Sequence, residues 1–166
     1  MAALLALDVG DARIGLARAE AGSSFAFGRG YLRRQGLRRD VAAVKARAEE
    51  EGAELVVVGL PRSLSGGDSA QTRRVRAFAG TLDAAGLTVA FEDERLTSRL
   101  AGQDLLKSGK GKKKRQEKGL LDEGAAVRIL ETYLARQAHQ AQAHQAQTHQ
   151  AQTHQAKAHQ AKADEG

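Results

Sequence analysis

Residues 4–17 read LLALDVGDARIGLA, an apolar run that ends in a carboxylate, then a polar turn with a glycine, then a second apolar run. A short apolar run bounded by a Gly/Asp turn is typical of a strand at the centre of a sheet, so a buried strand is predicted over 3–9. Asp8 falls at its end, where a carboxylate is costly unless it is exposed in a cleft, hydrogen-bonded or bound to a cation. Gly10 and Gly15 allow the backbone to bend and a ligand to approach closely.

The rest of the chain alternates between strand and helix patterns. Strands over 14–19 and 25–32 follow the first through short links and predict an antiparallel meander. Further strands are predicted over 54–59 and 87–92, and helices over 37–51, 70–85 (capped by Ser69), 98–107 and 119–136. Because alternating strands and helices imply parallel crossovers, we predict an α/β fold with a mixed five-stranded sheet flanked by helices.

Composition bounds the class of protein. A chain of 166 residues is long enough for one domain with a real core. It has no cysteine, which excludes disulfides and thiolate metal sites. No apolar run approaches 18 residues and no signal peptide is recognised, so a cytoplasmic protein without a membrane segment is expected.

Positive charge is concentrated in one segment. Residues 107–118 carry seven basic side chains and one acid, which matches the whole formal net charge of +6. Two arginine clusters occur elsewhere, at 29–39 and 73–76. A localised basic excess favours a polyanionic partner, although a solvated loop is the alternative for a single lysine run.

From residue 138 onward the chain is rich in Ala, Gln and His. Its histidines recur every five residues, so successive ones rotate by about 140° on a helix and never share a face. The segment has no apolar stripe and cannot build a core. We therefore predict a domain over 1–137 and a low-complexity tail over 138–166 that is disordered or weakly helical.

Acidic residues follow the predicted strand ends. Asp8 ends the first strand, Asp93 and Glu94 follow the last, and Asp122 lies near the start of the final helix. Each has an ordinary explanation: a turn for Asp8, an ion pair for Glu94, the positive end of a helix for Asp122. Brought together, these carboxylates suit Mg²⁺ or Mn²⁺, and two such ions support phosphodiester cleavage.

Four motifs carry a family resemblance. They are DVGDARIGLA at 8–17, VVGLP at 57–61, DERLTS at 93–98 and LDEGAA at 121–126. Over residues 3–136 the chain resembles the YqgF/RuvX family of Holliday-junction-resolvase-like and pre-16S rRNA nucleases. The resemblance implies an RNase H-like sheet and two-metal catalysis, with Asp8, Glu94 and Asp122 as catalytic and metal-binding acids. Asp93 is expected to be a secondary acid.

The hypothesis is a divalent-metal-dependent endonuclease acting on branched DNA or precursor rRNA. The resemblance implies that Arg13, Arg62 and Arg95 lie on the substrate side. The basic segment adds expected phosphate contacts: Lys110, Lys112, Lys113, Lys114 and Arg115. A homodimer is expected if a four-way junction is cut symmetrically. The alternative is a non-catalytic nucleic-acid-binding or ribosome-assembly module with the same fold. An actin-like ATPase is disfavoured because the chain is too short for a two-lobed nucleotide cleft.

Overall fold

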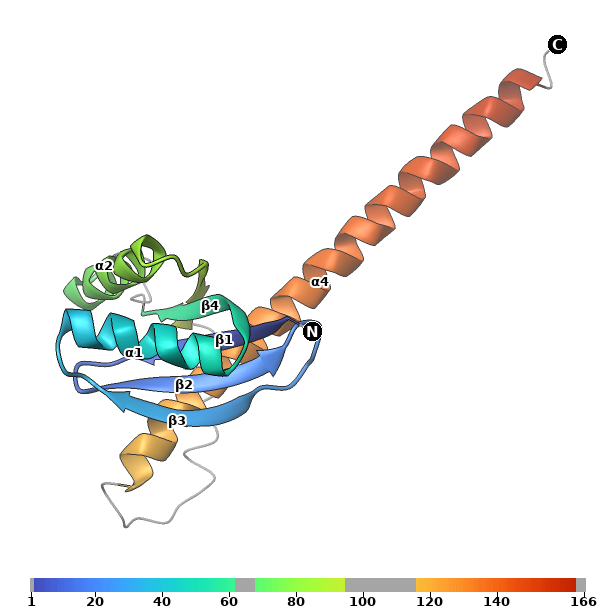
Figure 1. Cartoon of the computed structure of the whole chain (residues 1–166). Helices are drawn as coiled ribbons and strands as arrows, with labels where there is room; N and C mark the ends of the chain where they lie inside the picture. Colours follow the sequence, from blue (N-terminus) through green and yellow to red (C-terminus); the bar gives the residue numbers. More distant parts are fainter. Residues whose placement is uncertain (1, 62–67, 95–115, 164–166) are drawn as a thin grey trace. The chain divides into compact units, whose positions relative to one another are not determined.

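The computed structural model describes residues 2–61, 68–94 and 116–163, and its centre is a five-stranded mixed sheet (Figure 1). The strands are β1 (Ala3–Val9), β2 (Arg13–Glu20), β3 (Phe27–Arg33), β4 (Ala53–Leu60) and β5 (Val89–Asp93). The helices are α1 (Leu37–Glu50), α2 (Ala70–Ala84) and α4 (Gln116–Ala163). Apart from the far end of α4, each of these elements was predicted within a few residues of its ends.

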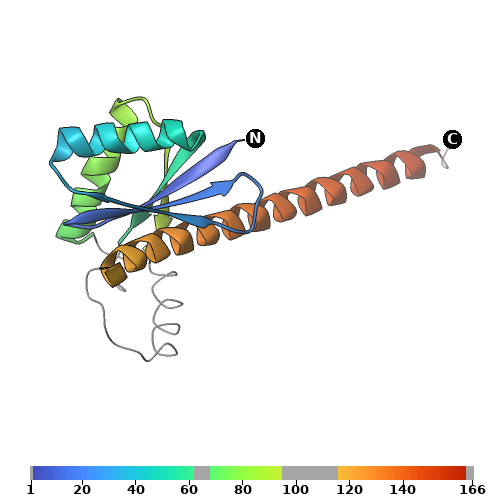
Figure 2. The ribbon, with the colours of Figure 1, turned by 60° about the horizontal axis from the view of Figure 1, so that its bottom comes forward.

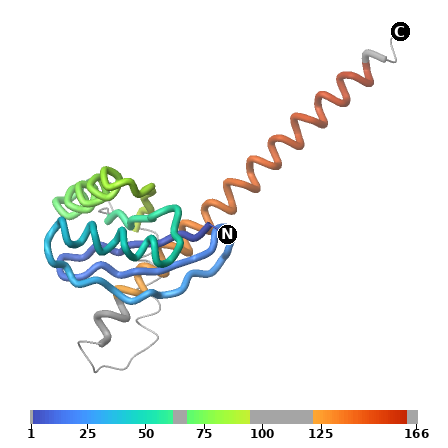
Figure 3. The backbone as a smooth tube through the Cα atoms, viewed as in Figure 1, coloured from blue at the N-terminus to red at the C-terminus, as the bar shows by residue number. Residues whose placement is uncertain are grey.

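Strand pairing confirms the predicted mixed topology. The order is β3-β2-β1-β4-β5, with β1, β2 and β3 antiparallel and β4 parallel to both β1 and β5 (Figure 3). Short turns allow the antiparallel pairs, whereas each parallel pair spans a helix, as crossovers require. β1 is thereby the central strand, and its carboxyl end lies at the edge where β4 and β5 also end.

Alternation along β1 divides the core into two layers. Leu5 and Leu7 point to one face and pack with residues of α1 and α2, such as Val44 and Phe78. Leu4 and Ala6 point to the other face and pack with residues of α4, such as Ile129 and Leu130. Figure 2 shows α1 and α2 on one side of the sheet and the first part of α4 on the other. Because both faces are covered, β1 reads as a continuous apolar run.

The predicted cap of α2 is confirmed. Ser69 accepts a hydrogen bond from the Thr72 backbone N–H at 3.2 Å, and the Thr72 hydroxyl receives the Ser69 N–H in return. This reciprocal arrangement satisfies two otherwise unpaired donors at the helix start. α1 begins differently, after Gly36, whose φ of 112° is readily reached only by glycine.

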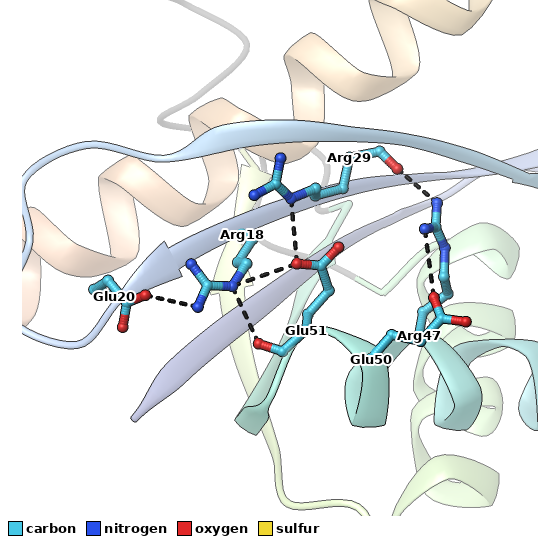
Figure 4. Close-up of polar contacts among 6 residues, drawn as sticks. All are labelled: Arg18, Glu20, Arg29, Arg47, Glu50 and Glu51. Carbon is cyan, nitrogen blue, oxygen red and sulfur yellow. Dashed lines mark hydrogen bonds and ion pairs between the residues drawn. The ribbon is translucent and has the colours of Figure 1, made fainter. Parts of the chain in front are cut away.

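Ion pairs and a hydrogen bond from arginines hold α1 against the sheet, and one of these arginines, Arg29, belongs to the first cluster. The Glu51 carboxylate, just past α1, lies 3.2 Å from Arg29 Nε and 3.4 Å from Arg18 Nε (Figure 4). Arg47 donates a 2.7 Å hydrogen bond to the Arg29 carbonyl. Arg29 therefore has a structural role, and being basic does not by itself make a residue available to a polyanion.

The chain divides into two compact units, Met1–Leu134 and Ala135–Gly166. The tail was predicted to be disordered or weakly helical, whereas α4 continues as helix to Ala163, with exposed side chains over residues 138–161. Alanine and glutamine have high helix propensity, which favours helix even without an apolar stripe. The predicted helix over 98–107 and most of the basic loop lie outside the described residues. None of the described helices is both long enough and apolar enough to span a bilayer.

Candidate active site

Asp8 lies on the α4 side of the sheet at the carboxyl end of β1. It pairs across the antiparallel ladder with Gly15 of β2, and directly opposed residues point to the same face. Its neighbours along the strand on this face, Ala6 and Leu4, belong to the core under α4. A carboxylate at this position is therefore placed at the border between the apolar layer and the sheet edge.

Gly15 brings α4 against the sheet. A Cβ atom built on Gly15 would collide with the backbone carbonyl of Asp122, at the second turn of α4. The glycine was interpreted as room for a ligand, but its space is taken by the helix. Since Gly15 faces Asp8 across the ladder, this close approach places Asp122 beside Asp8.

Gly59 leaves room for the Glu94 side chain. A Cβ atom on Gly59 would lie 2.6 Å from Glu94 Oε1 and would also clash with the Ile129 side chain of α4. Gly59 belongs to the VVGLP motif, and it lies on the face of β4 that packs under α4 because Val57 does so. The motif thus provides the space that the Glu94 carboxylate occupies.

The carboxyl groups of Asp8 and Glu94 perturb each other. Burial is the main cause that raises the pKa of Glu94 to about 8, followed by the charge of Asp8, their mutual hydrogen bond and the charge of Asp93. Burial also raises the pKa of Asp8, the hydrogen bond from Glu94 lowers it, and the charge of Asp122 raises it. The shared hydrogen bond raises the pKa of Glu94 and lowers that of Asp8, as expected when a protonated Glu94 donates to an ionised Asp8.

The remaining acids differ in their placement. Asp93 pairs with Leu60, whose side chain belongs to the layer under α1 and α2, so Asp93 points away from Asp8. Glu92 pairs with Gly59 and is fully buried on the α4 side, a placement that sequence reasoning missed. The alternation of Ala90, Glu92 and Glu94 indicates that these side chains share one face of the sheet. Only the register of β5 against β4 shows that this is the α4 face.

Arg13 is held beside Asp122. Its Nη1 lies 3.7 Å from Asp122 Oδ2, and its guanidinium lies 5.4 Å from the centre of the Tyr31 ring. Tyr31 of β3 pairs with Gly15, so it shares the face of Asp8, and it is partly exposed. Tyr31 was not among the predicted substrate-binding residues.

Several predicted residues lie outside the described part of the chain: Arg62, Arg95, Lys110, Lys112, Lys113, Lys114 and Arg115. Among the acids, Asp122 occupies the second turn of α4, which begins at Gln116. The helix dipole acts mainly within the first turn, so the positive helix end is a weak explanation for this aspartate.

The donor chemistry suits a hard divalent cation. Asp8, Glu94 and Asp122 offer carboxylate oxygens, which Mg²⁺ and Mn²⁺ prefer. A bound cation would offset the desolvation and like-charge repulsion that raise the pKa of Asp8 and Glu94. In ranges 2–61, 68–94 and 116–163, no three histidine or acidic side chains are already gathered to hold one ion. Binding would therefore require these carboxylates to draw closer together.

A pH-dependent effect on folding stability follows from Glu94. Because its pKa is raised from 4.5 to about 8 in the folded chain, its stabilising contribution is complete below pH 4.5 and is lost as the pH rises through 8. In metal-free buffer, Glu94→Gln should therefore gain stability relative to wild type between pH 5 and pH 8.5, on the order of 2–4 kcal/mol. Urea unfolding at both pH values measures this difference.

The matched control is Glu54→Gln, which changes an exposed glutamate on β4. The free energy of unfolding of this variant should equal that of wild type at both pH values. An equal response of the two variants would show that burial of Glu94 does not perturb its ionisation.

Comparison with known proteins places the chain in a family. A protein of Thermus thermophilus named "Putative pre-16S rRNA nuclease" is 49% identical over 131 residues, covering 79% of this chain and 96% of its own. "Ribonuclease YqgF" of Deinococcus radiodurans is 42% identical over 135 residues, covering 80% and 88% respectively.

The solved structure of T. thermophilus RuvC in complex with a Holliday junction substrate matches with a TM-score of 0.53 at 15% identity, covering 83% of this chain and 97% of RuvC. At that identity the likeness shows the fold, which is RNase H-like as expected. The family model described as RuvX, Holliday junction resolvase, matches residues 2–136. This chain therefore belongs to the RuvX family.

Proposed function

We propose that this protein is a divalent-metal-dependent endonuclease that hydrolyses phosphodiester bonds in structured nucleic acid. The observation that carries the proposal is the hydrogen bond between Asp8 of β1 and Glu94 after β5, with Asp122 of α4 close enough for its charge to act on Asp8. Membership of the RuvX family and relatives named as nucleases support the same activity.

Asp8, Glu94 and Asp122 would hold the metal. Mg²⁺ or Mn²⁺ ions bound by carboxylates, two of them in the proposed site, activate water and stabilise the leaving oxygen in phosphodiester cleavage. Asp8 and Glu94 are buried and share one hydrogen bond, and the proton on Glu94 keeps two negative charges from lying side by side before the metal binds. Metal binding would displace the proton from Glu94, so affinity for the metal should rise with pH.

Arg13 would position both Asp122 and the substrate. Its guanidinium faces the Asp122 carboxylate at 3.7 Å, while its buried Nη1 makes no hydrogen bond among the described residues. A guanidinium donor next to the acids suits a phosphate oxygen on the strand to be cut. Tyr31, lying beside Arg13, offers a ring on which an adjacent base would stack.

The substrate is proposed to be precursor 16S rRNA, a four-way DNA junction, or both, encountered in the cytoplasm. For a junction, two copies of the chain related by a twofold axis would supply the two cuts. For precursor rRNA one active site is sufficient. The two substrates therefore make different demands on oligomeric state.

A cleavage assay tests the proposal. Full-length protein and the variant Asp8→Asn are incubated in Mg²⁺ or Mn²⁺ with a four-way DNA junction, duplex DNA, single-stranded DNA and RNA, and a precursor rRNA. Both are repeated with the chain ending at Gln137, because the histidines of the tail can bind transition metals. Cleavage above the Asp8→Asn background supports a nuclease; none, with binding retained, supports the non-catalytic module.

The basic segment should control salt dependence. Replacing Lys112, Lys113 and Lys114 by glutamine is expected to weaken nucleic-acid binding and to reduce the slope of log affinity against log salt by up to about 3, one for each lost phosphate contact. Fluorescence anisotropy over a series of KCl concentrations measures the slope. Replacing Lys45 and Lys157, which lie elsewhere and are exposed, provides a control that should leave it unchanged. An unaltered slope in the triple variant would remove the segment from the binding surface.

A further inference from the structure

A cavity of about 450 Å³ lies on the face of the sheet opposite the acids. Its walls come from the link before α1, the first turns of α1 and one side of α2, and its base includes Val9 and Gly10, which directly follow Asp8. Because successive strand residues point to opposite faces, Asp8 faces the candidate active site while Val9 faces the cavity. The two sites thus share the carboxyl edge of β1.

The cavity contains a fixed planar cation. Arg34 donates 2.8 Å hydrogen bonds from Nε to the Asp40 carboxylate and from Nη1 to the Gly10 carbonyl. Its guanidinium also lies 5.2 Å from the centre of the Phe78 ring. Asp40 is buried and accepts a further 2.8 Å hydrogen bond from the Gln35 backbone. These contacts hold the Arg34 plane rigidly, while 27% of its side chain stays exposed.

The lining is close to neutral and partly apolar. Arg34 is balanced by Asp40, and Arg74 is balanced by Asp11 at 3.7 Å, so the formal charges of the walls cancel. Val75 and Phe78 contribute apolar surface, and Gln71 contributes an amide that both donates and accepts. A neutral planar group with hydrogen-bonding edges suits such a site better than a free phosphate does.

Exposed arginines stand next to lining residues on both helices. Arg38 and Arg39 follow Leu37 in the first turns of α1, and Arg73 and Arg76 neighbour the lining residues of α2. These are members of the two arginine clusters of the sequence that the acid site does not use. A neutral pocket next to exposed arginines matches a nucleotide, whose base is uncharged and whose phosphates are anionic.

We infer that this cavity binds an unpaired nucleobase of the strand whose backbone passes the acids, with the Arg34 plane and the apolar wall receiving the base. The inference rests on the proposed function for the identity of the strand. A strand that crosses the edge of β1 would present its phosphate to Asp8 on one face and a flanking base to the cavity on the other. The substrate class is therefore nucleic acid with an unpaired segment next to the cut.

The test fills the cavity. Ala77 is an exposed alanine of α2 that lines the cavity, and Ala84 is an exposed alanine of the same helix outside it. In the full-length Asp8→Asn background with EDTA, anisotropy compares a short single-stranded DNA with an abasic strand of the same length. The parent should prefer the base-bearing strand, and Ala77→Trp should reduce that preference about tenfold, the effect of losing one stacked base. Ala84→Trp should keep it.

The preference separates a binding role from a structural one. Because the abasic strand keeps its phosphates, its affinity and salt slope should be alike in all three proteins. If Ala77→Trp lowers the thermal unfolding midpoint, Ala77→Leu is used instead, because leucine fills the cavity with a smaller side chain. Equal preferences in the variants at 77 and 84, or no preference in the parent, would overturn the inference. A loss at position 77 without cleavage by wild type would support the cavity and refute the nuclease.

Discussion

Asp8→Asn is expected to lose cleavage on the order of a thousandfold or more, while it still folds and still binds nucleic acid. Metal ligation contributes several kcal/mol to transition-state stabilisation, and every 1.36 kcal/mol is about a factor of ten in rate. Asparagine keeps the shape of the side chain but removes the charge that an ion between Asp8, Glu94 and Asp122 would need. The single-turnover rate on the preferred substrate measures the loss.

Folding and binding distinguish this loss from general damage. Burial raises the pKa of Asp8, so a neutral side chain at this position should leave the free energy of unfolding unchanged or increased. Removing a negative charge should leave nucleic-acid affinity unchanged or slightly higher. Asp83→Asn, an exposed acid at the end of α2, is the matched control and should cleave as wild type does. Equal rates in the two variants would exclude Asp8 from the chemistry.

Gly15→Ala is expected to destabilise the fold by about 1–3 kcal/mol and to reduce cleavage at the same time. The added methyl group meets the Asp122 backbone, which cannot swing aside as a side chain can. The second turn of α4 must therefore move from the sheet and carry Asp122 away from Asp8. Urea unfolding measures the stability, and the cleavage rate under folded conditions measures the displacement.

Gly28→Ala provides a close comparison. It lies on β3 on the same face of the sheet, and the three atoms nearest to its added methyl group all belong to the Glu123 side chain, which can rotate aside as backbone cannot. This variant should cost less stability than Gly15→Ala and should keep cleavage near wild type. If the two variants behave alike, the approach of the Asp122 backbone does not set the position of the acid.

The sequence predicted those parts of the molecule that depend on local pattern. The apolar run before Asp8 predicted the central strand, and the helical pattern over 70–85 predicted α2, whose Val75, Phe78 and Leu82 pack in the core. Ser69 identified the start of α2 because capping depends on residues only three apart. The placement of Asp8 and Glu94 at one edge followed from the expected parallel crossovers.

The features that were missed depend on register and on three-dimensional contact. Gly15 was interpreted as a space for a ligand, since only the pairing of β2 and the position of α4 show that the helix occupies it. Tyr31 reaches the α4 face through a shift in the pairing of β2 with β3, where Gly30 has a φ of 75°. Simple alternation along β3 does not locate such a shift, so the position of Tyr31 beside Arg13 was not foreseen.

The glycines under α4 bear on how such a site is recognised or transplanted. Asp122 can approach Asp8 because the residue paired with Asp8 on β2, Gly15, has no side chain. Glu94 likewise occupies the space left by Gly59 on β4. A design that grafts the three acids onto a new sheet will fail to assemble them unless it also leaves these two strand positions bare. In genome searches, likewise, an aspartate with a glycine seven positions later is a more selective signature than the aspartate alone, because the glycine is needed for the close contact between α4 and the sheet.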